Sequence, residues 1–200
     1  NGRQLTSYEK EIGEGEDKET ISLTYLYDAD GLRTQKTTGD GVVTKFYYSG
    51  SKLAYQKDSA GNKLYFFYDA SGNLSVIRQV TPNKDYHFYV TTNAQGDVLG
   101  IYSSTGTLLA SYEYDAWGNC TIVTDNPTYN IGATNPIRYR RYYYDSETEL
   151  YYLQSRYYDP EIGRFLNADG YVSTDVTDPL AYNMFAYCQN NPVNRVDLNG

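Results

Sequence analysis

Short runs of strand-forming residues alternate with polar turn sequences along most of the chain. The runs are rich in Tyr, Phe, Val, Leu and Thr, which suit a pleated and half-buried surface. The clearest of them cover residues 42–48, 64–68, 86–90, 98–102 and 108–114. No stretch has the spacing of apolar residues that marks a long amphipathic helix. The pattern therefore predicts an all-β fold.

A short motif that opens with Asp and closes with Gly separates the runs. It reads YDADG from Tyr27, YDASG from Tyr68 and YDAWG from Tyr114, with degenerate copies between these three. An Asp side chain can accept a hydrogen bond from the backbone two residues on, and Gly supplies the positive φ that closes a short hairpin loop. Such repeats predict an extended antiparallel meander of Tyr-Asp (YD) hairpins that pair side by side in a curved sheet.

Four tyrosines have the spacing of anchors in successive repeat units. Tyr27, Tyr48, Tyr68 and Tyr89 follow one another at intervals of 21, 20 and 21 residues. Large aromatic side chains bury much apolar area and pack well on a sheet. We therefore expect each of the four to anchor one unit.

Two segments depart from the repeat pattern. Residues 9–19 are charge-rich and contain two glycines, so we expect a loop or a frayed end there. Residues 125–135 are polar and rich in turn formers, which indicates a connection into a different C-terminal part. We therefore divide the chain into a hairpin strip, residues 1–134, and an irregular C-terminal segment, residues 135–200.

The composition is acidic and rich in tyrosine. There are 25 Tyr and 6 Phe among 200 residues, and the formal net charge is −8. This charge argues against a nucleic-acid partner and against binding to an anionic membrane surface. No apolar run approaches the ~20 residues of a membrane span. The repeat pattern is already under way at Asn1 and stops at Gly200, so we expect a fragment of a longer protein.

Few residues suit metal binding or histidine-dependent catalysis. The only histidine, His87, lies in a predicted strand, and the only cysteines are Cys120 and Cys188. We therefore predict no metal site and no cofactor, since metal sites need more ligands than these. The cysteines are either two free thiols or a single disulfide that ties the hairpin strip to the C-terminal segment.

Basic and aromatic residues are interleaved early in the C-terminal segment. Arg138, Arg140 and Arg141 alternate with tyrosines. Such a pattern can suit stacking on nucleic-acid bases. The acidic balance of the chain favours cation–π contacts and packing in the sheet instead.

The C-terminal segment resembles the Rhs repeat-associated core domain, and the upstream motifs resemble the YD repeats of the same bacterial family. The matching pieces are RYR at 138–140, YYD at 143–145, LYYL at 150–153, RYYDPEIGRF at 156–165, AYNMFAYCQNNP at 181–192 and DLNG at 197–200. A lone Tyr-Asp motif would be weak support. The ordered series carries the resemblance.

The resemblance implies a containment function. Proteins of this family resemble hollow shells, in which a strip of YD hairpins spirals into a β-cocoon around a C-terminal toxin and the core domain closes one end. The expected function is a fragment of a shell that encapsulates and delivers a toxin, secreted or attached to the bacterial cell surface or wall. The expected partners are the toxin domain that follows and further YD repeats of the parent chain.

The resemblance also implies self-cleavage just after the core, by a chemistry similar to that of aspartic proteases. Two carboxylates share a proton, so that one acts as base on a water molecule and the other acts as acid. An arginine holds one of them ionised or polarises the carbonyl group. On this sequence the arginine is Arg156, the carboxylates are Asp169 and Asp197, and the scissile bond lies just beyond Gly200.

Both aspartate motifs depart from the family pattern. The family has DP-x-G in both places, whereas this chain has DGYV from Asp169 and DLNG from Asp197, 28 positions apart. Proline fixes φ and would help to place each carboxylate. A second interpretation therefore stays open, in which both aspartates cap tight turns. At most, the chain is a single-turnover autoprotease and not a turnover enzyme.

A different class of function stays open as well. An aromatic and polar sheet face also suits a carbohydrate-binding or adhesion module at the cell surface, with no catalysis, because sugar rings stack on Tyr and Trp. In that case the partners would be cell-surface glycans.

Overall fold

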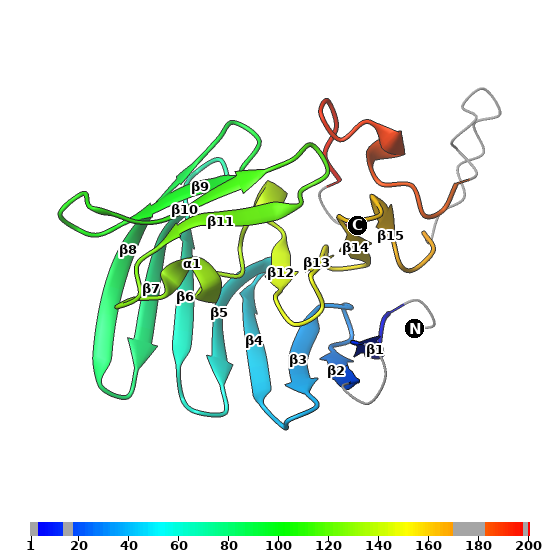
Figure 1. Ribbon diagram of the computed structural model, residues 1–200, viewed down its shortest axis with the longest axis horizontal. Coiled ribbons are helices and arrows are strands. Elements are labelled where there is room, and N and C mark those ends of the chain that lie inside the picture. The colour runs from blue at the N-terminus through cyan, green and yellow to red at the C-terminus, as the bar shows by residue number, and fades with distance from the viewer. Residues whose placement is uncertain (1–3, 14–17, 170–182, 198–199) are drawn as a thin grey trace.

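A curved antiparallel sheet dominates the computed structural model, which describes residues 4–13, 18–169, 183–197 and 200 (Figure 1). Within these residues the sheet has eleven strands that follow one another in chain order as a single meander. The predicted all-β fold and its antiparallel hairpins are thus confirmed. The strands are β1 (Ser7–Ile12), β2 (Glu19–Tyr27), β3 (Arg33–Thr38), β4 (Val43–Ser49), β5 (Lys52–Asp58), β6 (Lys63–Tyr68), β7 (Leu74–Thr81), β8 (Lys84–Thr92), β9 (Val98–Tyr102), β10 (Leu108–Tyr114) and β11 (Cys120–Asp125).

The YD motifs form the hairpin turns as predicted. In the first of them, Gly31 donates its N–H to the Asp28 carbonyl at 3.2 Å, and the Asp28 carboxylate accepts the N–H groups of Asp30 and Leu32. Gly31 has a φ of 88°, which glycine adopts at little cost. The same glycine bond closes the turns opened by Thr38, Asp58, Asp69, Asn93, Ser103 and Asp115.

Tyrosine hydroxyl groups tie strands to their neighbours along the meander. Tyr48 in β4 donates to the Arg33 carbonyl in β3 at 2.9 Å, and Tyr68 in β6 donates to the Leu53 carbonyl in β5 at 3.0 Å. A register shift directly before each of these tyrosines makes a β-bulge, which re-aims the side chain. Phenylalanine could pack here but could not donate this bond. The equivalent donors and acceptors elsewhere are Tyr27 with Leu5 and Tyr114 with Val98.

Tyr89 does not occupy the anchor position that its spacing predicts. Its side chain is 50% exposed, because it directly follows the buried Phe88 in β8 and so points to the opposite face of the sheet. The register shift in this strand comes later, before Thr92, and Asn93 opens the turn. In this unit the 20-residue spacing of the tyrosines therefore no longer matches the positions of the turns.

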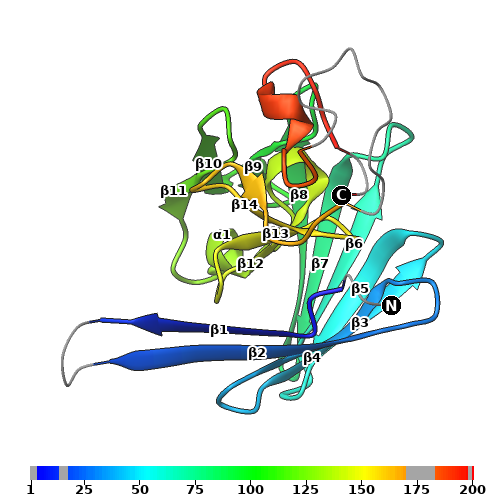
Figure 2. The ribbon, with the colours of Figure 1, turned by 90° about the vertical axis from the view of Figure 1, so that its right-hand side faces the viewer.

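The prediction of a loop or a frayed end over residues 9–19 is wrong for residues 9–12 and for Glu19, and residues 14–17 lie outside the described residues. β1 pairs with β2 from Ser7 opposite Thr24 to Ile12 opposite Glu19, and Figure 2 shows both strands projecting from the rest of the sheet. β1 is an edge strand with mostly exposed side chains. Charged residues suit such a strand because they discourage pairing with another chain, so the charge that suggested a loop is compatible with an edge.

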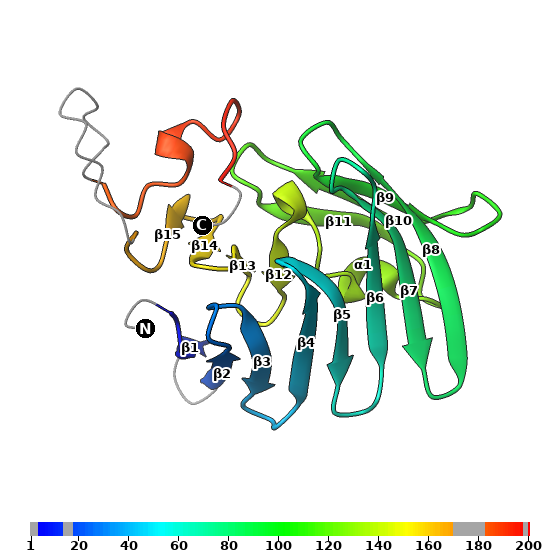
Figure 3. The same cartoon turned by 180° about the vertical axis from the view of Figure 1, so that it is seen from behind.

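A second, smaller sheet packs against the concave side of the large one (Figures 1 and 3). The chain reaches it through the helical turns α1 (Ile131–Thr134) and η2 (Tyr139–Arg141), and a further turn, η3 (Cys188–Asn190), follows it. Its strands are β12 (Tyr143–Asp145), β13 (Leu150–Tyr152), β14 (Tyr157–Asp159) and β15 (Arg164–Phe165).

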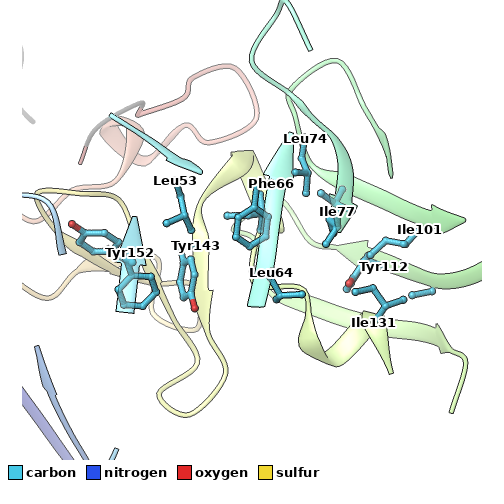
Figure 4. Close-up of a cluster of buried hydrophobic side chains, with 14 of the residues drawn as sticks. Leu53, Leu64, Phe66, Leu74, Ile77, Ile101, Tyr112, Ile131, Tyr143 and Tyr152 are labelled. Carbon is cyan, nitrogen blue, oxygen red and sulfur yellow. The ribbon is translucent and has the colours of Figure 1, made fainter. Parts of the chain in front are cut away.

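One cluster of buried side chains joins the two sheets. Leu64, Phe66 and Ile77 from the large sheet share it with Tyr143 and Tyr152 from the small one (Figure 4). The predicted boundary at residue 134 falls in the connection between the sheets, and the division into two domains stays a prediction. The shared core fixes the C-terminal segment against the strip and thereby positions the residues described next.

Candidate functional site

Arg156, the first of the residues inferred from the sequence, lies in the connection between β13 and β14. Leu153 donates its N–H to the Arg156 carbonyl at 2.9 Å, and Gln154 has a φ of 66°, so the chain turns sharply just before Arg156. The guanidinium carbon lies 3.6 Å from the centroid of the Phe165 ring. One guanidinium nitrogen donates to the Met184 carbonyl at 3.0 Å. These contacts fix the side chain in place.

Both predicted aspartates lie against this guanidinium group. One carboxylate oxygen of Asp169 and one of Asp197 each lie 3.2 Å from the same nitrogen, Nη2. The Arg156 side chain is 7% exposed, whereas those of Asp169 and Asp197 are 38% and 26% exposed. Burial lowers the pKa of Arg156, and the two carboxylates oppose that shift. The three residues, called the open cluster below, thus come together although both prolines of the family pattern are missing.

Gly200 is held directly beside the open cluster. Its N–H donates to the Asp197 carboxylate at 2.8 Å, and its carbonyl oxygen accepts a hydrogen bond from the Ser155 hydroxyl at 2.5 Å. Gly200 has a φ of 85°, and a Cβ atom at this position would lie 2.9 Å from the Leu153 carbonyl oxygen. Any larger residue would therefore be strained here. Ser155 was not among the predicted site residues; its place beside Arg156 in the sequence was the available signal.

The open cluster has the groups that amide hydrolysis needs. It offers two partly exposed carboxylates, a fixed cation and an oriented backbone carbonyl with a hydroxyl donor on its oxygen. The bond from Gly200 N–H to Asp197 is also the bond that a turn cap makes. The geometry is therefore compatible with both interpretations of Asp197.

A second arginine–carboxylate group, which the sequence did not reveal, lies deep between the two sheets. Arg33 in β3 is fully buried, and its guanidinium contacts the Asp145 carboxylate of β12 and the Tyr157 hydroxyl, the latter at 2.9 Å. The Lys36 ammonium lies 2.8 Å from the other Asp145 oxygen and 2.8 Å from the Glu147 carboxylate. We call Arg33, Lys36, Asp145 and Glu147 the sealed cluster.

Aromatic rings and charge together stabilise the sealed cluster. The Arg33 guanidinium carbon lies 4.5 Å from the ring centroids of Phe46 and Tyr152, within cation–π distance. Burial disfavours the charged form of Arg33, but Asp145 reverses this effect and the pKa of Arg33 is raised. Burial likewise disfavours the Asp145 carboxylate, but Arg33 and Lys36 hold its pKa below the ordinary value. The sealed cluster thus joins the hairpin strip to the C-terminal segment.

Comparison with known proteins identifies the family of this chain. The family model described as the teneurin YD-shell matches residues 12–193. The chain belongs to the teneurin YD-shell family. As a YD shell, it is similar to the tRNA nuclease WapA of Bacillus subtilis (strain 168), with 42% identity over 188 residues, and to Teneurin-3 of Danio rerio, with 29% identity over 109 residues. The resemblance to Rhs and YD-repeat shell proteins is thereby confirmed.

The chain spans only a small part of the length of WapA and of Teneurin-3. The 188 residues aligned with WapA are 93% of this chain and 8% of that protein, and the match to Teneurin-3 covers 54% and 4%. Among solved structures, a chain of the crystal structure of TcdB2-TccC3-TEV superimposes with a TM-score of 0.75 over 100% of this chain and 10% of that one. The identity in that comparison is 20%, so it supports the fold alone.

The structure also places the other residues that the sequence singled out. His87 is exposed on β8, and both cysteines are free thiols. The guanidinium group of Arg138 lies 4.4 Å from the centroid of the Tyr144 ring, which confirms a cation–π contact. Within the described residues, no three His, Cys, Asp or Glu side chains are grouped to hold a metal ion. No helix in the same residues is long and apolar enough to cross a membrane.

Proposed function

We propose that this chain is the closing part of a hollow shell that encloses a toxin domain, which follows it in the parent protein. The packing of the C-terminal segment on the concave side of the curved sheet supports this role (Figure 1). The chain spans 8% of the WapA sequence. In this proposal, further YD repeats of the parent chain complete the shell. In this proposal the shell acts outside the bacterial cell, secreted or attached to the cell surface or wall, and delivers the toxin.

The proposal includes one self-cleavage after Gly200, which separates the toxin from its shell. The observation that carries it is the convergence of Asp169 and Asp197 on Arg156. The hydrogen bond from Ser155 to the Gly200 carbonyl supports it further, because this carbonyl belongs to the peptide group that would be cut. The bond from the Gly200 N–H to Asp197 holds the same residue beside the open cluster.

The cleavage step follows from the groups around Gly200. One aspartate, ionised beside Arg156, takes a proton from a water molecule, whose oxygen attacks the carbonyl carbon of Gly200. The Ser155 hydroxyl donates to the carbonyl oxygen as negative charge develops on it. The other aspartate, protonated, gives its proton to the amide nitrogen of the next residue, and the C–N bond breaks. The products are a carboxylate on Gly200 and a new amino terminus.

The experiment is expression of the chain with a short stretch of the parent sequence after Gly200, followed by intact-mass measurement. We expect two products from the wild type, cut after Gly200. The Asp197→Asn variant keeps the size of the side chain but cannot exchange a proton, so we expect cleavage to slow by at least about 100-fold.

Asp159→Asn is the matched control. Asp159 belongs to the same C-terminal segment, and its carboxylate accepts the nearby N–H of Glu161 at 2.9 Å. This variant should be cut at the wild-type rate. An uncut wild-type chain, or equal cleavage rates in wild type and Asp197→Asn, would refute self-cleavage and leave the turn-capping interpretation.

Glycan binding is the second candidate function, supported by a row of tyrosines on the face opposite the core. Tyr47 and Tyr55 stack with ring centroids 4.2 Å apart and Tyr55 and Tyr65 with centroids 5.1 Å apart, across three neighbouring strands. Sugar rings could stack on such a surface. A glycan array probed with the chain tests this candidate: binding that is lost in Tyr47→Ala supports it, and a silent array removes it.

A further inference from the structure

A cavity at the seam between the hairpin strip and the C-terminal segment has no part in the proposed cleavage. Its volume is about 300 Å³, and it lies where the turns at residues 51–53 and 71–72 meet residues 137–143 and 152–154. The rings of Tyr48 and Tyr68 and the side chain of Leu53 form part of its wall. Arg156, with its two aspartates, does not line the cavity.

Two positive side chains meet at this cavity. A methyl group added to Gly72 would lie 3.3 Å from the Lys52 ammonium nitrogen and 3.5 Å from Nη1 of Arg141, so both cations reach the same point. Neither forms an ion pair with a carboxylate of the residues that the structure describes. Adjacent like charges repel each other. An anion placed between Lys52 and Arg141 would remove that repulsion.

Contacts with neighbouring turns hold the Arg141 side chain at the cavity. Its stem passes so close to Gly96 that an added Cβ there would lie 2.8 Å from its Cγ, and Nη1 donates to the Ser71 carbonyl at 3.3 Å. Arg140 and Arg141 have φ values of 51° and 68°, and Gln154, also on the cavity wall, has 66°. Non-glycine residues in the left-handed region are costly and concentrate at functional positions.

We propose that this cavity binds a small organic anion with an aromatic or apolar body. The anionic group lies between Lys52 and Arg141, and the body lies against the Tyr68 ring and Leu53. The Lys52 ammonium is already 5.6 Å from the centroid of the Tyr68 ring. The Tyr68 hydroxyl is occupied by the Leu53 carbonyl, so this ring offers apolar surface to a ligand. The apolar wall favours an organic anion over a bare inorganic ion.

A fluorescence titration with anilinonaphthalene sulfonate tests the proposal, because this probe combines an aromatic body with one sulfonate group. Phenylnaphthylamine has a similar aromatic body without the sulfonate and serves as the neutral probe. At low ionic strength we expect one saturable site for the sulfonate probe, with a dissociation constant about tenfold or more below that of the neutral probe. Added salt should weaken the sulfonate binding.

Variants assign the binding to the two cations. Lys52→Gln and Arg141→Gln should each lower the affinity for the sulfonate probe by about tenfold. Neither should change the affinity for the neutral probe. Lys57→Gln, which changes an exposed lysine of the same strand outside the cavity, should leave both probes unchanged. Circular dichroism checks that each variant is folded. Lys52 is exposed, so we expect Lys52→Gln to fold.

Three results would each overturn the proposal. They are the absence of saturable binding, equal affinity for the two probes, and an unchanged sulfonate affinity in folded Lys52→Gln. Because the probes are added to the uncut chain, none of these results depends on whether the chain cleaves itself.

Discussion

The sealed cluster and the open cluster both pair an arginine with carboxylates, but they differ in the number of cations and in the burial of the carboxylate that the arginine contacts. In the sealed cluster, Arg33 and Lys36 both contact Asp145, whose side chain is fully buried, and Lys36 also contacts the partly exposed Glu147. In the open cluster, a single cation, Arg156, contacts two carboxylates that are 38% and 26% exposed. Both arginines are largely buried, whereas the carboxylate in contact with Arg33 is fully buried and those in contact with Arg156 are partly exposed.

We propose that this difference separates a structural role from a chemical one. A buried carboxylate between two cations is held ionised and cannot reach water, so it can only fix the parts of the fold that contribute to it. The two carboxylates that share Arg156 are partly exposed, so solvent can reach them. The same pair of residue types thus docks the C-terminal segment at one place and offers acid–base groups at another.

The largest effect is expected from Arg33→Ala. The change leaves the buried Asp145 with Lys36 alone and empties the space between the rings of Phe46 and Tyr152. Breaking a buried pair in this way costs about 3–5 kcal/mol, so we expect a loss of that size in the free energy of unfolding. Urea denaturation followed by circular dichroism measures it.

Arg78→Ala is the matched control for Arg33→Ala. Arg78 forms an ion pair with Asp85 at 2.6 Å, but the two side chains are 40% and 44% exposed. Exposed pairs contribute about 0–1 kcal/mol, and we expect a loss in that range. If both variants lost the same amount, burial would not distinguish the sealed cluster from a surface pair.

Lowering the pH is expected to have a smaller effect on the free energy of unfolding. The folded-state pKa of Asp145 lies below its unfolded value, which is about 3.9. Its ion pairs therefore contribute fully above that unfolded value, and the contribution is lost as the pH falls through the folded pKa. We expect the free energy of unfolding to fall as the pH is lowered below about 4.

Comparison with Asp145→Asn isolates this contribution from that of the other carboxylates. The variant has lost the titrating group, so its free energy of unfolding should depend less steeply on pH in the acid range. Parallel urea titrations at several pH values measure the two slopes. Identical slopes would show that Asp145 does not contribute to the acid dependence.

Much of the hairpin strip was predictable because its signals are local. Asp28 and Gly31 set a turn through contacts within four residues, and the same motif repeats down the chain. Prediction failed where a local signal was ambiguous. Charge at residues 9–12 suits a loop and an edge strand alike, and the spacing of Tyr89 does not reveal that its turn comes later.

The two clusters depend on contacts between residues far apart in the sequence, which local patterns do not predict. Arg33 and Asp145 are 112 positions apart, and a charged residue in a strand pattern is expected to face solvent. Only the packing of the C-terminal segment on the strip brings them together. Arg156, Asp169 and Asp197 were named because their motifs resemble those of a family, and neither their spacing nor the chain's composition would have placed them on one nitrogen.

The most direct test compares the free energies of unfolding of Asp145→Asn and Asp197→Asn, measured in parallel by urea denaturation at neutral pH. Asp145→Asn leaves Arg33 buried without a carboxylate, and we expect a loss of about 3 kcal/mol or more. Asp197→Asn leaves Asp169 on Arg156, and we expect a loss below about 1 kcal/mol. Equal losses, or a larger loss in Asp197→Asn, would contradict the division into a sealed structural cluster and an open chemical one.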